Sequence, residues 1–265
     1  MQKRIFKSGV LVLALLLSGC GVLPETIDET EGWSASKLYA EARDELTSGG
    51  YERAIQYFEK LESRYPFGTY AQQAQMEIAY IHYLQGDQAE ALAAAERFIK
   101  LHPNHPNVDY VYYLRGLINF NDRRGLLDFI SSQDPTERDP KAARDAFDAF
   151  KQLAERFPNS KYTPDAIARM KYLVNAIAQH EVHVANYYYR RGAYVAAANR
   201  AQIVVKEYSE TPAVEEALFV MMRAYNALNL PELRDDAERV LKQNFPNSAF
   251  FSGGPVKTEP WWKFW

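Results

Sequence analysis

Five segments of this 265-residue chain end alike, and their spacing constrains the fold more than any other feature. Each ends in a ring-bearing side chain followed by Pro or Ser. The intervals between these final residues are 37, 55, 51 and 37 residues, so a base period of 37 with two insertions accounts for all of them. A period between 20 and 50 residues is typical of helical solenoids and other repeat proteins. The final residues, called anchors below, are Pro66, Pro103, Pro158, Ser209 and Pro246.

Small and aromatic residues recur at fixed distances before four of the anchors. Alanine stands twelve residues before each of them, and glycine marks the turn between two helical stretches in three of the repeats, where it accepts the left-handed conformation. The pattern resembles the tetratricopeptide repeat, a pair of antiparallel helices. The resemblance implies an all-α tetratricopeptide-repeat solenoid of five helix pairs over residues 34–248, with a degenerate fifth repeat. The residues concerned are Ala54, Ala91, Ala146 and Ala197, then Phe58, Ala95, Phe150 and Ala201 eight before the anchor, and Gly49, Gly86 and Gly192.

The two insertions fall at definable places. The first adds 18 residues after Gly116 and predicts a charged loop at about 122–139, which either decorates the surface or contacts a partner. The second adds 14 residues, close to four helical turns. Because no Gly or further Pro follows Pro164 until Gly192, it predicts one helix over about 164–191. Such a helix of about 42 Å would brace the two halves of the solenoid.

The N-terminus has the features of an export signal. Three cations precede an apolar run from Gly9 to Leu17, which is too short to span a membrane. The following Leu-Ser-Gly-Cys resembles the bacterial lipobox, and this implies a signal peptide over 1–19 and acylation of Cys20, with palmitate among the lipids. Gly21 after the cysteine favours the outer membrane under the enterobacterial sorting rule. Residues 20–33 are polar and predict a lipidated flexible tether.

Composition and motifs give little support to catalysis. The chain carries 31 basic and 34 acidic residues, so no basic excess indicates nucleic-acid binding. A single cysteine excludes an internal disulfide. No phosphate-binding loop, nucleophile elbow or HExxH motif occurs, and we expect no cofactor, no metal and no enzyme activity. The rival class, a lipid-anchored hydrolase, would need His180 or His183 to bind a metal.

The first helices of the repeats predict a binding groove. In the tetratricopeptide family, positions two, five, nine and twelve of a repeat tend to face inward, and six of the twelve such residues in the first three repeats are aromatic. Each aromatic alone is equally explained as core, but a row of tyrosines suits a groove for aromatic peptide segments because tyrosine buries a large area and keeps a polar tip. The candidates are Tyr39, Arg43, Met76, Tyr80, Tyr83, Tyr110, Tyr113 and Phe120.

Several strings, taken with the lipobox and the inserted repeats, identify a more specific family. They include Arg64-Tyr65-Pro66-Phe67-Gly68, His105-Pro106-Asn107, Arg138-Asp139-Pro140 and Arg191-Gly192-Ala193. Over residues 1–248 the chain resembles the BamD (ComL) family. The resemblance implies a lipid-anchored scaffold on the periplasmic face of the outer membrane, in the β-barrel assembly (BAM) complex. It implies binding to BamA, BamC, BamE and unfolded barrel proteins, with Arg200 on the BamA side. The alternative is a repeat lipoprotein that serves as an adaptor for peptidoglycan synthesis or envelope constriction.

The segment 249–265 extends beyond where shorter family members stop. Its Gly-Gly-Pro cannot continue a helix, and Trp261, Trp262, Phe264 and Trp265 follow. Three interpretations remain open at this point: packing on the chain's own last repeat, anchoring at a membrane interface, or occupation of a groove as a mimic of a substrate's aromatic terminus.

Overall fold

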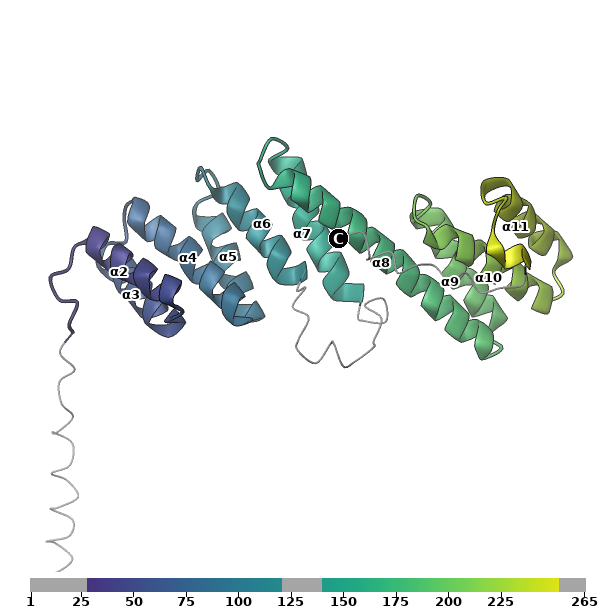
Figure 1. Ribbon diagram of the computed structural model, residues 1–265, viewed down its shortest axis with the longest axis horizontal. Helices are drawn as coiled ribbons and strands as arrows, with labels where there is room; N and C mark the ends of the chain where they lie inside the picture. The colour runs from purple at the N-terminus through teal and green to yellow at the C-terminus, as the bar shows by residue number, and fades with distance from the viewer. Residues whose placement is uncertain (1–27, 121–139, 253–265) are drawn as a thin grey trace, which may run out of the picture.

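The computed structural model describes residues 28–120 and 140–252, and within these ranges it contains helices and no strands. The helices pair in chain order and follow one another along an extended row (Figure 1). This confirms the predicted all-α architecture of five helix pairs. The helices are α2 (Ala35–Ser48), α3 (Tyr51–Arg64), α4 (Thr69–Gln85), α5 (Gln88–Leu101), α6 (Val108–Phe120), α7 (Pro140–Arg156), α8 (Thr163–Arg190), α9 (Tyr194–Glu207), α10 (Ala213–Ala227) and α11 (Pro231–Asn244), with a 3₁₀ helix η3 (Ala249–Ser252) at the end.

The turns within the pairs are made by residues in the left-handed conformation. Gly49, Gly86 and Gly192 have φ values of 84°, 88° and 76°, as their place after the first helix predicts. In the fifth pair Asn229 takes this conformation instead, with φ of 55°. Asparagine tolerates the left-handed region better than most residues, so the degenerate repeat keeps the same turn without glycine.

The predicted small residues form the contact between paired helices. All eight alanine and phenylalanine positions before the first four anchors are fully buried. Gly116 on α6 is packed so closely that a Cβ atom there would lie 2.3 Å from Cε1 of Phe150. In the fifth pair the equivalent positions hold Arg234 and Glu238, and the buried residues of α11 are Ala237 and Leu241 instead.

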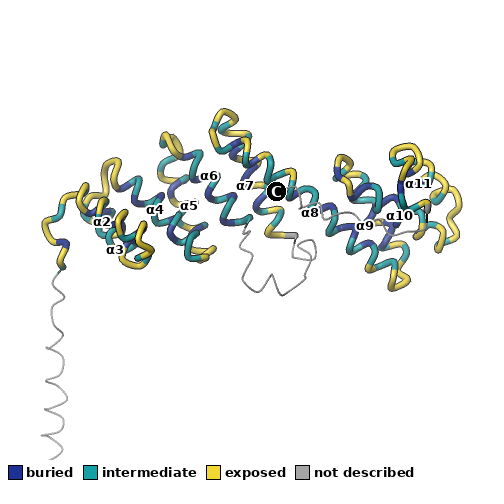
Figure 2. The backbone as a smooth tube through the Cα atoms, in the orientation of Figure 1, coloured by how far each residue is buried: buried dark blue, intermediate teal, exposed yellow. Residues whose placement is uncertain are grey.

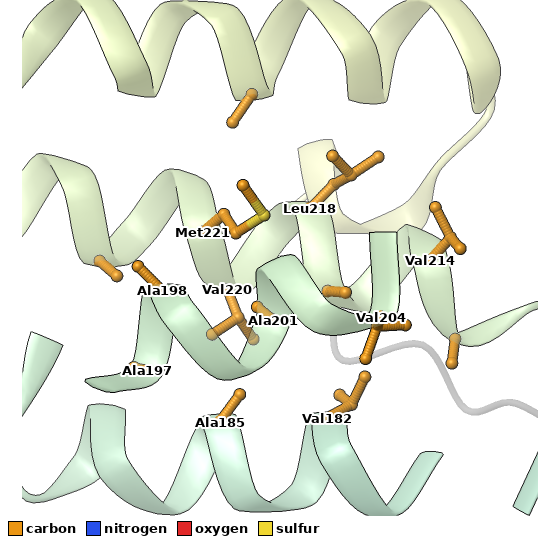
Figure 3. Packing of buried hydrophobic residues seen from close by; sticks show 14 of the residues in the cluster. Val182, Ala185, Ala197, Ala198, Ala201, Val204, Val214, Leu218, Val220 and Met221 are labelled. Carbon is orange, nitrogen blue, oxygen red and sulfur yellow. The ribbon is translucent and has the colours of Figure 1, made fainter. Parts of the chain in front are cut away.

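Three hydrophobic clusters make up the core, and α8 belongs to two of them. Its N-terminal half contributes Ala166 and Leu173 to the cluster built from α4 to α7. Its C-terminal half packs on α9 and α10, where Val182 and Ala185 face Val204 and the alanines of α9 (Figure 3). The helix is 28 residues long and occupies the stretch for which the sequence predicts one uninterrupted helix. One rigid element therefore joins the two halves of the row.

First and second helices of the pairs lie on different sides of the solenoid. The first helices α2, α4 and α6 contact one another in turn, as do α8 and α10. Among the described residues no comparable contact joins consecutive second helices, and open hollows of about 370 and 260 Å³ separate α3 from α5 and α5 from α7. The first helices thus form the closer-packed, inner side. Buried residues follow the helix faces that meet, and the turns are exposed (Figure 2).

Both ends of the described chain are more ordered than expected. The expectation of a free tether up to residue 33 is wrong for residues 28–33: Thr30 is buried, and Asp28 accepts a hydrogen bond from Lys60 Nζ (2.6 Å) and pairs with Arg64. Hydrogen bonds from Lys60 and then Thr30 hold the pKa of Asp28 far below its usual range. At the other end, residues 249–252, the first of the segment 249–265, form η3.

Three of the predicted features lie outside the described residues. These are the signal peptide with Cys20, the loop at about 122–139, and the tail from 253 to 265. Within the described ranges, no helix is both long enough and apolar enough to cross a membrane.

Candidate functional site: a tyrosine row on the first helices

The predicted groove residues begin with a polar junction between α2 and α4. Arg43 pairs with the carboxylate of Glu77, and the Tyr39 hydroxyl donates a weak hydrogen bond of 3.4 Å to the same carboxylate. The ring of Tyr39 lies 5.5 Å from that of Tyr70, whose side chain is also exposed. Burial, followed by the nearby charge of Glu77, raises the pKa of Tyr39. The junction therefore places the rings of Tyr39 and Tyr70 beside the ion pair of Arg43 and Glu77, whose opposite charges cancel.

The middle of the row is formed by tyrosines of α4 and α6. The rings of Tyr80 and Tyr83 lie 6.3 Å apart on α4. Tyr110 on α6 is half-buried beside them, and its pKa is raised well above the usual value, chiefly by burial and then by Glu77 and Tyr80. A tyrosine hydroxyl can donate a hydrogen bond to a backbone carbonyl.

Between α6 and α8 the contact is made by aromatic side chains. The ring of Tyr113 stacks on that of Tyr162 at 4.9 Å with an angle of 16°. Its hydroxyl donates a 2.7 Å hydrogen bond to Asp165 Oδ2, which also accepts one of 2.6 Å from Arg169 Nε. Burial and then the bond to Asp165 raise the pKa of Tyr113 to about 12. For Asp165, burial opposes ionisation, but the bonds from Tyr113 and Arg169 outweigh it and lower the pKa.

Phe120 closes the row at the end of α6. Its ring lies 5.7 Å from Tyr172 and 6.1 Å from the buried Phe150, and the guanidinium of Arg169 sits 4.8 Å above it. We call the set Tyr39, Tyr80, Tyr83, Tyr110 and Tyr113 the tyrosine row. It places partly buried rings between two ion pairs, and the hydroxyls of Tyr39 and Tyr113 already donate to the carboxylates of those pairs.

One predicted groove residue is not available. Met76 has 8% of its surface exposed and belongs to the core cluster shared by α4, α5 and α6, so its assignment to the groove is wrong. Its unbranched side chain fills the space between helices. Conversely, sequence reasoning missed Glu77, Asp165 and Arg169. Glu77 is next to a predicted position, while the other two form an i,i+4 pair on α8, a spacing that signals an ion pair on a helix surface.

Arg200 has its partner within the chain. Its Nη1 lies 2.9 Å from Oε2 of Glu181, and Arg144 Nη2 lies 3.5 Å from the other oxygen of this carboxylate. The Glu181 side chain is 4% exposed, whereas those of Arg200 and Arg144 are 43% and 53% exposed. Three helices, α7, α8 and α9, are thus tied by one buried carboxylate, and one side of Arg200 remains open to solvent.

The histidine pair considered for a metal has no ligand set around it. His180 and His183 are half-buried on α8, and each already has an interaction partner. In residues 28–120 and 140–252, no group of three or more His, Cys, Asp or Glu side chains is placed to hold a metal ion.

Comparison with known proteins places this chain in a family. A family model described as "YfiO: Outer membrane lipoprotein" matches residues 32–241, which is most of the chain. The chain belongs to the YfiO family of outer membrane lipoproteins. The match to the family model spans all five helix pairs, from just before α2 into α11.

Close relatives of this YfiO family member carry one shared name. "Outer membrane protein assembly factor BamD" of Neisseria meningitidis serogroup B is 49% identical over 96% of each chain. The protein of the same name from Vibrio cholerae is 38% identical over 89% of this chain and 97% of its own. The one from Xylella fastidiosa strain Temecula1 is 36% identical over 96% of this chain and 88% of its own. The predicted resemblance to BamD is therefore confirmed.

Proposed function

We propose that this chain is a non-catalytic scaffold in the assembly of β-barrel proteins at the outer membrane, within a BAM complex. In this proposal it binds BamA, works beside the lipoproteins BamC and BamE, and holds unfolded barrel proteins near the site of insertion. A scaffold that binds two partners raises their effective concentration near each other, because their encounter becomes intramolecular. The observation that carries the proposal is 49% identity over 96% of the chain to an outer membrane protein assembly factor.

The tyrosine row is the proposed contact for extended segments of barrel substrates. An extended chain has unpaired carbonyl groups and alternating side chains, and aromatic side chains among them match the rings of the row. The neutralised pairs Arg43–Glu77 and Arg169–Asp165 flank it. Binding there then depends on aromatic area more than on net charge, and it changes little with salt.

Replacing two rings in the middle of the row tests this contact. In the double variant Tyr80→Ala/Tyr83→Ala we expect weaker crosslinking to a peptide that ends in aromatic residues, by roughly tenfold or more. BamA binding should stay unchanged. The control is Tyr187→Ala, which removes an exposed ring from the C-terminal half of α8. Equal loss of both binding activities, or of neither, contradicts the assignment of the groove.

Attachment to the membrane is proposed to occur through acylated Cys20, with the protein on the periplasmic face. Three acyl chains bind far more firmly than one, because each buried methylene contributes about 0.8 kcal/mol. A Cys20→Ser variant should fail to incorporate labelled palmitate and should leave the outer-membrane fraction. Retention of the variant in that fraction would refute the anchor.

Arg200 is proposed to contact an acidic group on BamA with its solvent-exposed side. The internal partner Glu181 holds the guanidinium in place, so the partner meets a preoriented cation. Co-purification from detergent-solubilised outer membranes tests the scaffold role as a whole. Recovery of BamA supports it, and recovery of a peptidoglycan synthase without BamA would overturn it.

A further inference from the structure

A second aromatic surface lies on the C-terminal half of the solenoid, on α8 and α10. The guanidinium of Arg223 on α10 sits 4.1 Å from the ring centre of Tyr189 on α8 and 5.4 Å from that of Phe219 on α10. Tyr189 also lies 5.3 Å from Tyr194 at the start of α9. We call Tyr189, Phe219 and Arg223 the α8–α10 platform. The tyrosine row, which supports the proposed function, lies on α2, α4 and α6 and shares no residue with it.

The end of the described chain is already seated on this platform. After α11 the chain forms η3, where the ring of Phe250 stacks on Phe219 with centres 4.5 Å apart and an angle of 21°. The backbone N–H of Phe250 donates a 3.3 Å hydrogen bond to the hydroxyl of the buried Ser248, which fixes the turn. The next ring, Phe251, is 39% exposed, with Lys242 Nζ 5.7 Å from its centre. The last described residues, after α11, thus contact the platform through the ring of Phe250.

Thirteen residues follow this point, from 253 to 265, and they end in Trp261, Trp262, Lys263, Phe264 and Trp265. At about 3.3–3.6 Å per extended residue they reach up to about 45 Å, more than enough to return to the platform. The aromatic residues come after a Gly-Gly-Pro turn sequence and a short polar spacer, so the chain can reverse before they begin.

From these observations we propose that the tail 253–265 binds the chain's own α8–α10 platform and extends the aromatic stack that Phe250 begins. The tail is tethered where Phe250 meets Phe219, so its effective concentration at the platform is in the millimolar range, and weak ring contacts suffice. The cation of Arg223, placed between two rings, supplies a further contact to an incoming indole. A partner that uses the inner face of α8 and α10 must displace the tail.

The tryptophans of the chain make this proposal directly testable. Four are present, and only Trp33 lies outside the tail, so a full-length Trp33→Phe protein in lipid nanodiscs reports on the tail alone. Phenylalanine keeps the ring that contacts Tyr57 at 5.8 Å. We expect blue-shifted emission with low acrylamide quenching, and no quenching by brominated lipid. Emission typical of free tryptophan in water, or quenching by brominated lipid, would overturn the proposal, the latter assigning the tail to the membrane surface.

Two platform variants in this background localise the contact. Phe250→Ala removes the first ring of the stack outside the helix pairs, and Arg223→Gln removes an exposed cation, so both should keep their helical circular dichroism. Each should lower the docking equilibrium of the tail by roughly two- to tenfold, in line with the loss of one aromatic or cation–π contact. Acrylamide quenching then rises. The control Phe67→Ala, which removes a 93% exposed ring between α3 and α4, should leave the quenching unchanged. Quenching that neither variant alters would refute the platform as the binding site.

Discussion

The carboxylate of Glu181 is the most informative place to perturb the solenoid. It is buried where α7, α8 and α9 meet, and its two oxygens face two different arginines, Arg200 at 2.9 Å and Arg144 at 3.5 Å. Both arginines are about half-exposed and can be solvated when unpaired. The Glu181 carboxylate cannot be solvated in the same way, because its side chain is 4% exposed. The cost of losing an arginine therefore depends on whether the other one remains.

This asymmetry predicts strong non-additivity. Arg200→Gln or Arg144→Gln alone should each lower the free energy of unfolding by about 1 kcal/mol or less, as for a partly exposed pair. The double variant leaves a buried carboxylate without a cation, a situation that costs about 3–5 kcal/mol. With single losses of about 1 kcal/mol each, the coupling between the two sites is then about 1–3 kcal/mol. Adding Glu181→Met should recover most of the loss, because an apolar side chain of similar length needs no partner.

Urea unfolding followed by far-UV circular dichroism measures these values. The midpoint should shift little in the single variants, fall clearly in the double variant and return in the triple variant, with an unchanged slope. Additive losses would mean that each arginine acts by itself. A triple variant as unstable as the double would show that the destabilisation does not come from the unpaired carboxylate. Either result would refute the reasoning.

Three further outcomes follow from the packing and from the shifted pKa values. Gly116→Ala should lower the free energy of unfolding by about 1–3 kcal/mol in urea titrations, because the new methyl group must displace the buried ring of Phe150. The pKa of Tyr113 is raised to about 12. Its contribution to the free energy of unfolding is therefore complete below pH ~10 and is lost as the pH rises towards about 12. The Tyr113→Phe variant should lack this alkaline loss in absorbance-monitored titrations. The pKa of Asp28 is lowered, so its contribution to the free energy of unfolding is present above its ordinary pKa and is lost in stronger acid. Because the Thr30 N–H donates to the Asp28 carboxylate, Asp28→Asn should speed amide hydrogen exchange at Thr30 at neutral pH.

Repetition explains why the backbone was predictable from the sequence. A helix pair cannot bury its own apolar face, so each repeat must pack on the next, and the same small residue is needed at each crossing. Ala54 and its equivalents, and the glycines in the turns, follow directly from this requirement. The fifth pair shows the limit of the argument. There Ala237 is buried in place of the alanine twelve residues before the anchor, which is Arg234 in this pair. Leu241 keeps the regular spacing, because it stands five residues before the anchor like the buried Leu61, Phe98, Leu153 and Val204.

The candidate site was only partly predictable, because repeat position gives the face of a helix and not the partner of a side chain. Met76 occupies an inward position by count, yet it is buried in the core cluster that α4 shares with α5 and α6. Arg200 was assigned to a partner, and it pairs with Glu181 on another helix. Such pairings join side chains on different helices, so they depend on how the helices pack against one another. The stacking of Phe250 on Phe219 likewise depends on how the end of the chain packs on α10.

The placement of α8 links these local details to function. Its N-terminal half carries Asp165, which bonds the tyrosine row, and its C-terminal half carries Glu181 and Tyr189, which hold Arg200 and the α8–α10 platform. Because a single helix of 28 residues is stiff, the distance between the proposed substrate contact and the Arg200 contact is set by its rise per residue. A scaffold gains from a fixed distance, since the orientation of two bound partners is then determined before they meet.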